Sequence, residues 1–291
     1  MRWIRMTVAL TVFLLAACGR LTGSGGGGTG PTGPSGGTIA HPTGSDELVL
    51  RWEHLGGFVP VEFDLARIPE WSLYGDGRVI VQGPQIEIYP GPALPNLLVF
   101  RLSEEGVQAV LRAARDAGLM DGDARYPQPC VMDAPATVFT VVAEGRTNVV
   151  EADALEIDAA CSGVDGVDEE ARARLREFQR ELGDLASWLP EGSIGAEEPY
   201  EADAIRIYAL PYRGDPDVPQ EPLTWPLATP LSRFGEPSAR LQDARCGVVT
   251  GPDLETLRPL FERATQLTPW VSDGERFGLV LRPLLPDERG C

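Results

Sequence analysis

The alternation of hydrophobic and polar residues predicts several paired β-strands. Residues 48–54 alternate strictly, as expected for a strand with one buried face. The runs 71–74 and 78–81 flank a Gly-Asp-Gly segment, a strong short-range signal for a β-hairpin. A second hairpin is predicted from the runs 137–142 and 147–150, which flank a Glu-Gly turn.

Helical spacing of apolar residues predicts three helices. The first begins after Ser103, which is suited to cap it, and ends at Gly118, which provides a left-handed stop. The second begins near Asp168, and its apolar residues then recur at intervals of three or four. The third is capped by Thr250 or Gly251 and carries a proline in its first turn.

These elements predict an α+β fold with two consecutive units. Over residues 47–189, antiparallel hairpins pack with two helices in the order ββ-α-ββ-α. A smaller α+β C-terminal unit follows over residues 200–291, with strands at 205–210 and 277–281. Residues 211–238 hold seven prolines and predict a long connection without regular structure.

The first 46 residues have a different pattern. Arg2 and Arg5 precede a short apolar run that ends in small residues, which is typical of an export signal peptide, here residues 1–17. This run is too short to cross a bilayer, which requires about 20 apolar residues. Residues 18–46 begin with a cysteine and are then rich in Gly, Pro, Ser and Thr, a composition that predicts a flexible tether.

The end of the signal peptide carries a specific motif. The sequence Leu15-Ala16-Ala17-Cys18 resembles a bacterial lipobox. The resemblance implies cleavage before Cys18 and attachment of lipid there, with acyl chains such as palmitate. We therefore expect a lipoprotein held at the extracytoplasmic side of the cell membrane by the anchor on Cys18. The alternative is an ordinary secretory signal in which this cysteine is incidental.

The other four cysteines predict disulfides. Cys130, Cys161, Cys246 and Cys291 form an even set in an exported chain, which indicates two bridges and allows three pairings. We prefer Cys130–Cys161 and Cys246–Cys291, because each pair then falls within one predicted unit. No Cys-x-x-Cys occurs and no histidine lies near these cysteines, so we expect neither a metal site nor a cofactor.

Charge and composition exclude several classes of function. All 25 basic residues are arginines, which excludes P-loop, Schiff-base and Ser-Lys chemistry because each needs a lysine. The net charge of −18 repels phosphates, so we expect no nucleic-acid partner. The chain has only two histidines. His54 shares a strand face with Leu48, Leu50 and Trp52, which predicts a neutral, hydrogen-bonded histidine at the core or its edge.

No catalytic set is evident in the sequence. A serine hydrolase would require His54 as its base, and no Gly-x-Ser-x-Gly motif is present. Paired carboxylates such as Glu104 with Glu105 could support glycoside hydrolysis, but their positions at helix starts favour capping instead. We therefore expect no catalytic residues and keep a carboxylate-based envelope hydrolase as an alternative.

Two segments resemble known families. Residues 73–79 (LYGDGRV), followed by a helix and a second hairpin, resemble uncharacterised exported bacterial domains, and the tail 282–291 (RPLLPDERGC) is similar to that of related lipoproteins. Neither resemblance implies an activity. Residues 56–58 (GGF) and 117–119 (AGL) resemble emfourin-type inhibitors of metalloproteases. The chain departs from that family in its lipid signal, its cysteines and its second half, so no inhibitory residue is carried over.

The proline-rich connection supplies the candidate binding surface. Tyr212, Trp225 and Phe234 lie in it, and on an extended backbone they could contact a protein or peptide of the envelope. The alternative is a loop that wraps its own domain with Trp225 packed inside. We expect a non-enzymatic binding or scaffolding module, with a protease inhibitor and a carboxylate hydrolase as alternatives.

Overall fold

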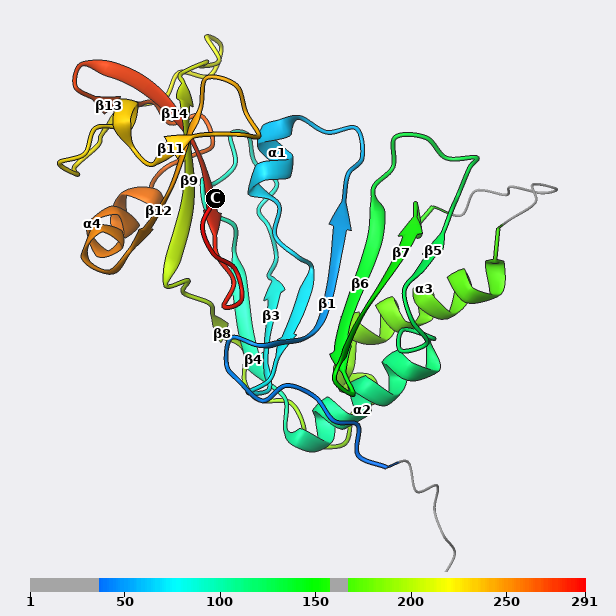
Figure 1. The fold of residues 1–291 in the computed structure, drawn as a ribbon. Helices are drawn as coiled ribbons and strands as arrows, with labels where there is room; N and C mark the ends of the chain where they lie inside the picture. Colours follow the sequence, from blue (N-terminus) through cyan, green and yellow to red (C-terminus); the bar gives the residue numbers. More distant parts are fainter. Residues whose placement is uncertain (1–36, 158–166) are drawn as a thin grey trace, which may run out of the picture. The chain divides into compact units, whose positions relative to one another are not determined.

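The strands of this protein form two sheets in the computed structural model, which describes residues 37–157 and 167–291 (Figure 1). By their contacts, residues 38–291 belong to one unit that holds both sheets. Four α-helices accompany the sheets in the described residues. The predicted α+β class is therefore confirmed.

The larger sheet has eight strands in the order β5-β7-β6-β1-β2-β3-β4-β8. All neighbours are antiparallel except β5 and β7. The strands are β1 (Leu48–Leu55), β2 (Trp71–Tyr74), β3 (Arg78–Gln82), β4 (Leu97–Arg101), β5 (Ala124–Tyr126), β6 (Ala136–Ala143), β7 (Arg146–Asp153) and β8 (Glu198–Pro199). Both predicted hairpins, β2–β3 and β6–β7, are confirmed as adjacent antiparallel pairs.

The smaller sheet has six strands in the order β10-β13-β14-β9-β12-β11. Its members are β9 (Ala204–Pro211), β10 (Leu223–Thr224), β11 (Glu236–Pro237), β12 (Arg245–Thr250), β13 (Trp270–Ser272) and β14 (Glu275–Pro283). The helix α4 (Gly251–Phe261) packs on this sheet through Leu254, Leu257 and Phe261. This helix begins after Thr250, as the sequence predicted.

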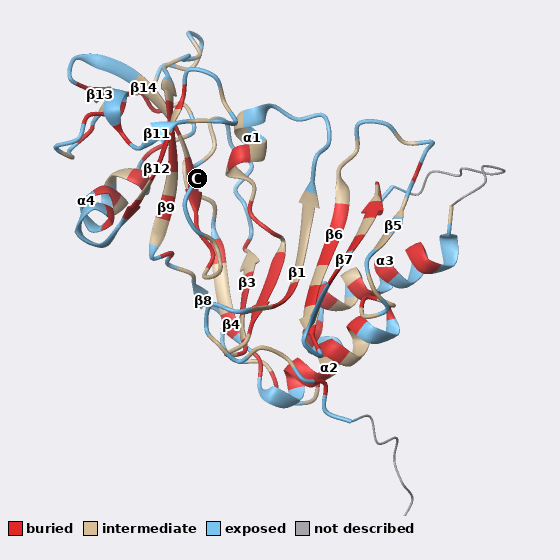
Figure 2. Ribbon diagram, in the orientation of Figure 1, coloured by how far each residue is buried: buried red, intermediate tan, exposed pale blue. Residues whose placement is uncertain are grey.

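Two helices, α2 (Glu104–Asp116) and α3 (Glu169–Gly183), cover one face of the larger sheet (Figures 1 and 2). The Ser103 hydroxyl accepts a hydrogen bond from the amide of Gly106 (3.2 Å), and the Asp168 carboxylate accepts one from the amide of Ala171 (2.9 Å). The predicted cap at Ser103 is thereby confirmed, and Asp168, near which the second helix was predicted to begin, caps α3. Capping satisfies amide groups that a helix start leaves without partners, so these residues fix where the helices begin.

A β-bulge near the start of β1 corrects one predicted face. The register of β1 against β2 shifts between Leu48 and Leu50. Leu50 packs under the helices, whereas Leu48 packs on the opposite face with Tyr74 and Leu285. An inserted residue reverses the alternation of side chains on one side of the bulge, which strict period-two counting does not anticipate.

The segment before β1 is attached to the folded part. Ile39 is buried, its amide donates to Oε1 of Gln108 (2.8 Å), and its carbonyl accepts from Nε2 of the same side chain (2.9 Å). The amide of Ala40 donates to Oε1 of Glu144 in the β6–β7 turn (2.7 Å). Residues from Ile39 onward are therefore ordered against the sheet, and the predicted tether applies only to residues before Thr38.

Several short elements were not predicted. They include β4, β5, β8 and the helix α1 (Val61–Ala66). No side chain caps α1, which follows Pro60 and has only six residues, so its sequence carries no start signal. Its position against β14 reflects tertiary packing, since isolated helices of this length are unstable in water.

The C-terminal tail crosses the face of the larger sheet opposite to α2 and α3. Leu285 is buried there against Tyr74 and Ile80. The Asp287 carboxylate accepts hydrogen bonds from Nη2 of Arg51 (2.8 Å) and from the hydroxyl of Tyr74 (2.9 Å). The RPLLPDE segment therefore owes its composition to packing and to buried ion pairs.

Candidate functional site

The three residues predicted as a binding surface do not form one. Trp225 is only 5% exposed, and its indole Nε1 donates a hydrogen bond to the carbonyl of Thr229 (2.8 Å). Its ring packs edge-on against Phe234 and Trp270, with centroids 5.6 and 6.1 Å apart. This finding corrects the predicted surface, because the rings fill the core of the smaller sheet, where burial of large aromatic groups is favourable. Tyr212 is half-buried and lines a small hollow.

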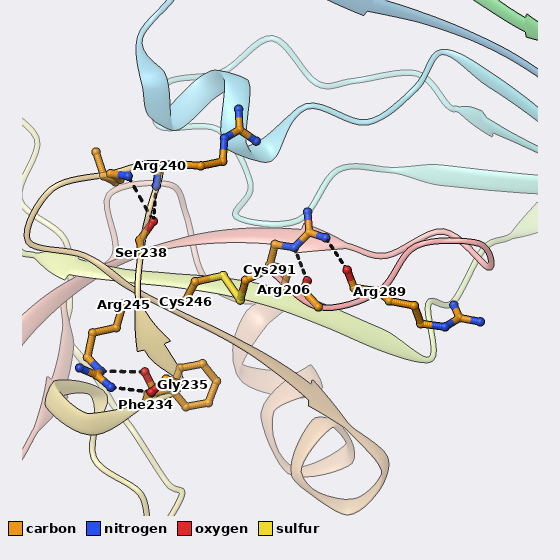
Figure 3. The surroundings of a disulfide bond; sticks show 11 residues. Arg206, Phe234, Gly235, Ser238, Arg240, Arg245, Cys246, Arg289 and Cys291 are labelled. Atoms are coloured by element: carbon orange, nitrogen blue, oxygen red, sulfur yellow. Dashed lines mark hydrogen bonds between the residues drawn. A yellow bond between two sulfur atoms is a disulfide. The ribbon is translucent and has the colours of Figure 1, made fainter.

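One predicted disulfide is confirmed. Cys246 on β12 is bonded to Cys291, with their Cα atoms 6.0 Å apart (Figure 3). Beside it, Nε of Arg206 donates to the carbonyl of Gly290 (2.7 Å) and Nη2 donates to the carbonyl of Arg289 (3.3 Å). The bond therefore ties the end of the tail to the smaller sheet.

Two further predictions involve residues outside the described part of the chain. Cys161 lies there, so the pairing Cys130–Cys161 stays a prediction. Cys18 also lies there, and its lipidation stays a prediction for the same reason. Among the described residues, no helix has the length and apolar character needed to span a membrane.

A hollow lies at the end of the larger sheet where β1 ends and β6 begins. It has a volume of about 760 Å³ and is lined by α1, by the loops on either side of that helix, by residues 82–95, and by parts of the 133–135 and 156–157 segments. We call this cavity the apolar hollow. Its size lies within the range of pockets that bind ligands.

Exposed hydrophobic side chains concentrate at this hollow. In the described residues, eleven large apolar side chains are exposed, and six of them line it: Phe58, Val59, Phe63, Ile86, Ile88 and Ile157. Phe58 is 87% exposed. Four others lie one or two residues from a lining residue, which leaves Val149 as the exception. Contiguous exposed apolar patches on a folded protein mark binding surfaces, because their hydration is unfavourable.

A second, smaller hollow adjoins the first. It has a volume of about 330 Å³ and shares five lining residues with the apolar hollow: Phe63, Ala66, Ala93, Gln266 and Leu281. Tyr212 lines this second hollow. The two cavities therefore adjoin each other at α1, and one of the three predicted surface residues lines the second.

Three charged side chains meet at the wall of the apolar hollow. His54, near the end of β1, is hydrogen-bonded through Nε2 to Oε1 of Glu156 (2.7 Å) and through Nδ1 to Oε1 of Glu70 (3.2 Å). Glu156 also accepts hydrogen bonds from the hydroxyl of Thr137 (2.8 Å) and from Nε2 of Gln179 on α3 (2.9 Å). Five elements therefore converge on the His54–Glu156 pair: strands β1 and β6, the segments before β2 and after β7, and helix α3.

These contacts fix the protonation of the histidine. Hydrogen bonds to Glu156 and Glu70 raise the pKa of His54 to about 9, against the opposing effect of burial. Burial alone would raise the pKa of Glu156, but hydrogen bonds from His54, Thr137 and Gln179 outweigh it and lower that pKa to about 2. The predicted neutral His54 is thus corrected to an imidazolium at neutral pH.

This protonation state is unsuited to acid–base catalysis. A general base at neutral pH needs a pKa near the working pH and a free ring nitrogen, whereas both nitrogens of His54 are engaged. A glycosidase acid needs a raised pKa, whereas that of Glu156 is lowered. Within the described residues, no group of three or more His, Cys, Asp or Glu could hold a metal ion.

The sequence contained a weak signal for the hollow. Apolar residues such as Phe58, Ile86 and Ile88 occur in Gly- and Pro-rich segments, where no strand or helix is present to bury them. Their convergence could not be deduced, because the lining residues are spread along the chain from His54 to Leu281.

Comparisons with known proteins yielded no relatives. No family model, no curated protein and no solved structure matches this chain.

Proposed function

We propose that this chain is a bacterial lipoprotein that is anchored through Cys18 on the extracytoplasmic side of the membrane, and that its folded part is a non-enzymatic binding module. The lipobox-like sequence at Cys18 supports the anchor, and the disulfide Cys246–Cys291 supports an oxidising compartment. The hairpin formed by residues 73–79 and the tail 282–291, in which Leu285 is buried, support grouping the chain with the uncharacterised exported domains that share these segments.

The observation that carries the binding role is the concentration of exposed apolar side chains at one hollow. Six of the eleven line it, and four more lie within two residues of a lining residue in the sequence, although residues of this kind are usually scattered on a folded protein. Scattered exposed residues such as Val149 need no explanation, whereas a rim with Phe58, Phe63, Ile86 and Ile88 does. Contact with a partner would remove this surface from water, which is favourable by about 25 cal/mol per Å².

Photo-crosslinking in intact envelopes tests this role. The photoreactive residue p-benzoylphenylalanine replaces Phe58 in one full-length variant and Val149 in a control variant. Both positions are exposed, but only Phe58 lies at the hollow. We expect an adduct of defined mass from position 58 and none of that mass from position 149. Absence of adducts at 58, or the same adducts at both positions, would rule out a binding site at the hollow.

A protease inhibitor is the second candidate, and one observation favours it. Phe58 is the most exposed large apolar residue described, and it follows Gly56 and Gly57, which both have positive φ. Its amide donates to the carbonyl of Asp133 (2.9 Å), so the loop that presents it is held in place. A held, exposed side chain could enter the cleft of a protease. Lack of inhibition by excess protein across secreted metalloproteases and serine proteases would exclude this function.

A further inference from the structure

We infer that the occupant of the apolar hollow is an extended polypeptide segment that combines apolar side chains with Lys or Arg. The inference rests on the proposed binding role of the hollow and adds the chemical class of the partner. Three features of the lining carry it: the two adjoining hollows, the amide groups and the unpaired carboxylates.

Two adjoining hollows favour a chain over a compact ligand. The apolar hollow of about 760 Å³ and the hollow of about 330 Å³ share five lining residues. Phe63 and Ala66 of α1 border both cavities. Successive side chains on one side of an extended peptide could each occupy one of two neighbouring hollows.

Amide groups in the lining favour a ligand with a polar backbone. Gln82 donates through Nε2 to the carbonyl of Ile68 (2.9 Å), and its Oε1 has no partner among the described residues. The side-chain amide of Gln266, between the two hollows, has no hydrogen-bond partner in the same part of the chain. A peptide backbone offers N–H and C=O groups to both. A hydrocarbon chain would leave them dehydrated without compensation, which costs about 1–3 kcal/mol per group.

The charges favour a cationic partner. Glu70 and Glu156 share the single positive charge of His54, so this cluster retains a net charge of −1 at neutral pH. Asp133 lines the hollow, and its carboxylate has no partner among the described residues. Arg67 is the other cation of the lining, and it lies 4.0 Å from the carboxylate of Asp64. An incoming Lys or Arg would therefore find negative charge that is only partly neutralised.

The surroundings extend this acidic character. Glu87 lies exposed between Ile86 and Ile88, and Glu62 lines the second hollow; neither has an ion-pair partner in the described residues. Arg213 lines the second hollow and is the opposing charge there. Carboxylates beside the apolar rim repel anionic lipid headgroups. In a symmetric homodimer formed through this surface, the carboxylates of the two subunits would face and repel one another. The charge pattern thus favours a basic peptide over a lipid and over a second copy of this chain.

Fluorescence anisotropy with designed peptides tests the inference. The full chain is placed in phosphatidylcholine nanodiscs, with empty nanodiscs as the blank. The probes are three labelled heptapeptides that alternate Leu with Lys, Leu with Glu, and Ser with Lys. We expect the Leu–Lys peptide to bind at least about tenfold more tightly than either of the others, because it alone supplies both apolar contact and charge.

Matched variants locate the binding. The pair Phe58→Ser and Ile88→Ser is expected to weaken Leu–Lys binding about tenfold or more, and Asp133→Asn about threefold. The controls Val149→Ser and Glu255→Gln alter exposed residues outside both hollows and are expected to have no effect. Circular dichroism of each variant shows that it is folded.

Each contrary outcome has a distinct meaning. Equal binding of the Leu–Glu peptide, or equal loss in the control variants, would overturn the inference. Tight binding of labelled oleate that displaces the Leu–Lys peptide would assign the hollow to lipid. A dimer in sedimentation experiments that Phe58→Ser dissolves would assign it to a second copy. In both of these cases a crosslink from position 58 would still support the binding role, whereas its absence would remove that role as well.

Discussion

At the scale of single residues, the protonation state of His54 depends on partners that are distant in the chain. Its side chain is 23% exposed and lies between Glu70 and Glu156, which are 16 and 102 residues away. Local sequence gives only its apolar neighbours on the strand, and these predicted a neutral ring. The two carboxylates instead hold a proton on the ring, and the partners of Glu156 come from two further elements.

This arrangement makes stability depend on pH in a defined direction. The folded protein keeps the proton up to pH about 9, whereas the unfolded chain releases it near pH 6.5. The contribution of His54 to the free energy of unfolding should be constant below pH 6.5. It should then fall by about 2 kcal/mol as the pH rises through 9. Urea unfolding at a series of pH values measures the slope.

The control for this measurement is His54→Gln, which keeps hydrogen-bonding capacity but cannot titrate. Above pH 6.5, the free energy of unfolding of this variant should fall less steeply with pH than that of the unmodified protein, although tyrosines still contribute near pH 10. Identical slopes in the two proteins would show that His54 is not held as an imidazolium.

At the scale of elements, local signals predicted the helices and hairpins well. Ser103 and Asp168 cap α2 and α3, because a side-chain oxygen close to a helix start satisfies amides wherever it occurs. The helix α1 and strand β8 lack such signals, since both depend on the surface against which they pack. The bulge in β1 also lacks a local sequence signal, because the extra residue can be recognised only from the register of β1 against β2.

The tail depends on a buried ion pair for its attachment. Arg51 and Asp287 are mostly buried. Burial lowers the pKa of Arg51, but the attraction and hydrogen bond of Asp287, together with the attraction of Tyr74 and Glu288, outweigh burial and raise that pKa. We expect Asp287→Ala to lower the free energy of unfolding by about 2–3 kcal/mol, because the guanidinium and the Tyr74 hydroxyl lose their shared acceptor. Chemical denaturation measures the loss.

The matched control for the tail is Asp46→Ala. Asp46 forms an exposed ion pair with Arg289 at 3.3 Å, and its removal should change the free energy of unfolding by less than about 0.5 kcal/mol. Equal effects of the two substitutions would show that the buried pair does not hold the tail.

At the scale of the whole molecule, the binding site is formed by segments that no local pattern connects. The apolar hollow combines the end of β1, α1, the proline-rich 83–95 segment and residues on β14 and beside β13. For the 211–238 connection, the alternative with Trp225 packed inside its own domain is confirmed, and Phe234 is buried with it in the core of the smaller sheet. The sequence predicted the disulfide Cys246–Cys291 correctly, because pairing within a unit needs only a rough idea of the fold.

The anchor is also a property of the whole molecule, and it can be tested directly. Replacement of Cys18 by Ala should abolish incorporation of labelled palmitate, because the sulfur that receives the lipid is removed. Labelling of Cys130→Ala should be retained, since this residue is a predicted disulfide partner. Unchanged labelling of the Cys18→Ala protein would refute the anchor.

Ile39 and Ala40 pack beside the β6–β7 turn, so the chain enters the folded part at one defined end of the larger sheet. These residues lie at the end of the larger sheet where Glu144 is found, whereas the hollow lies where β1 ends and β6 begins (Figure 1). A strand of eight residues spans about 25 Å between the two ends. Attachment to a sensor chip through the amino-terminal side should therefore leave the apolar hollow accessible to a ligand in solution. Coupling through residues 83–95 should instead obstruct it.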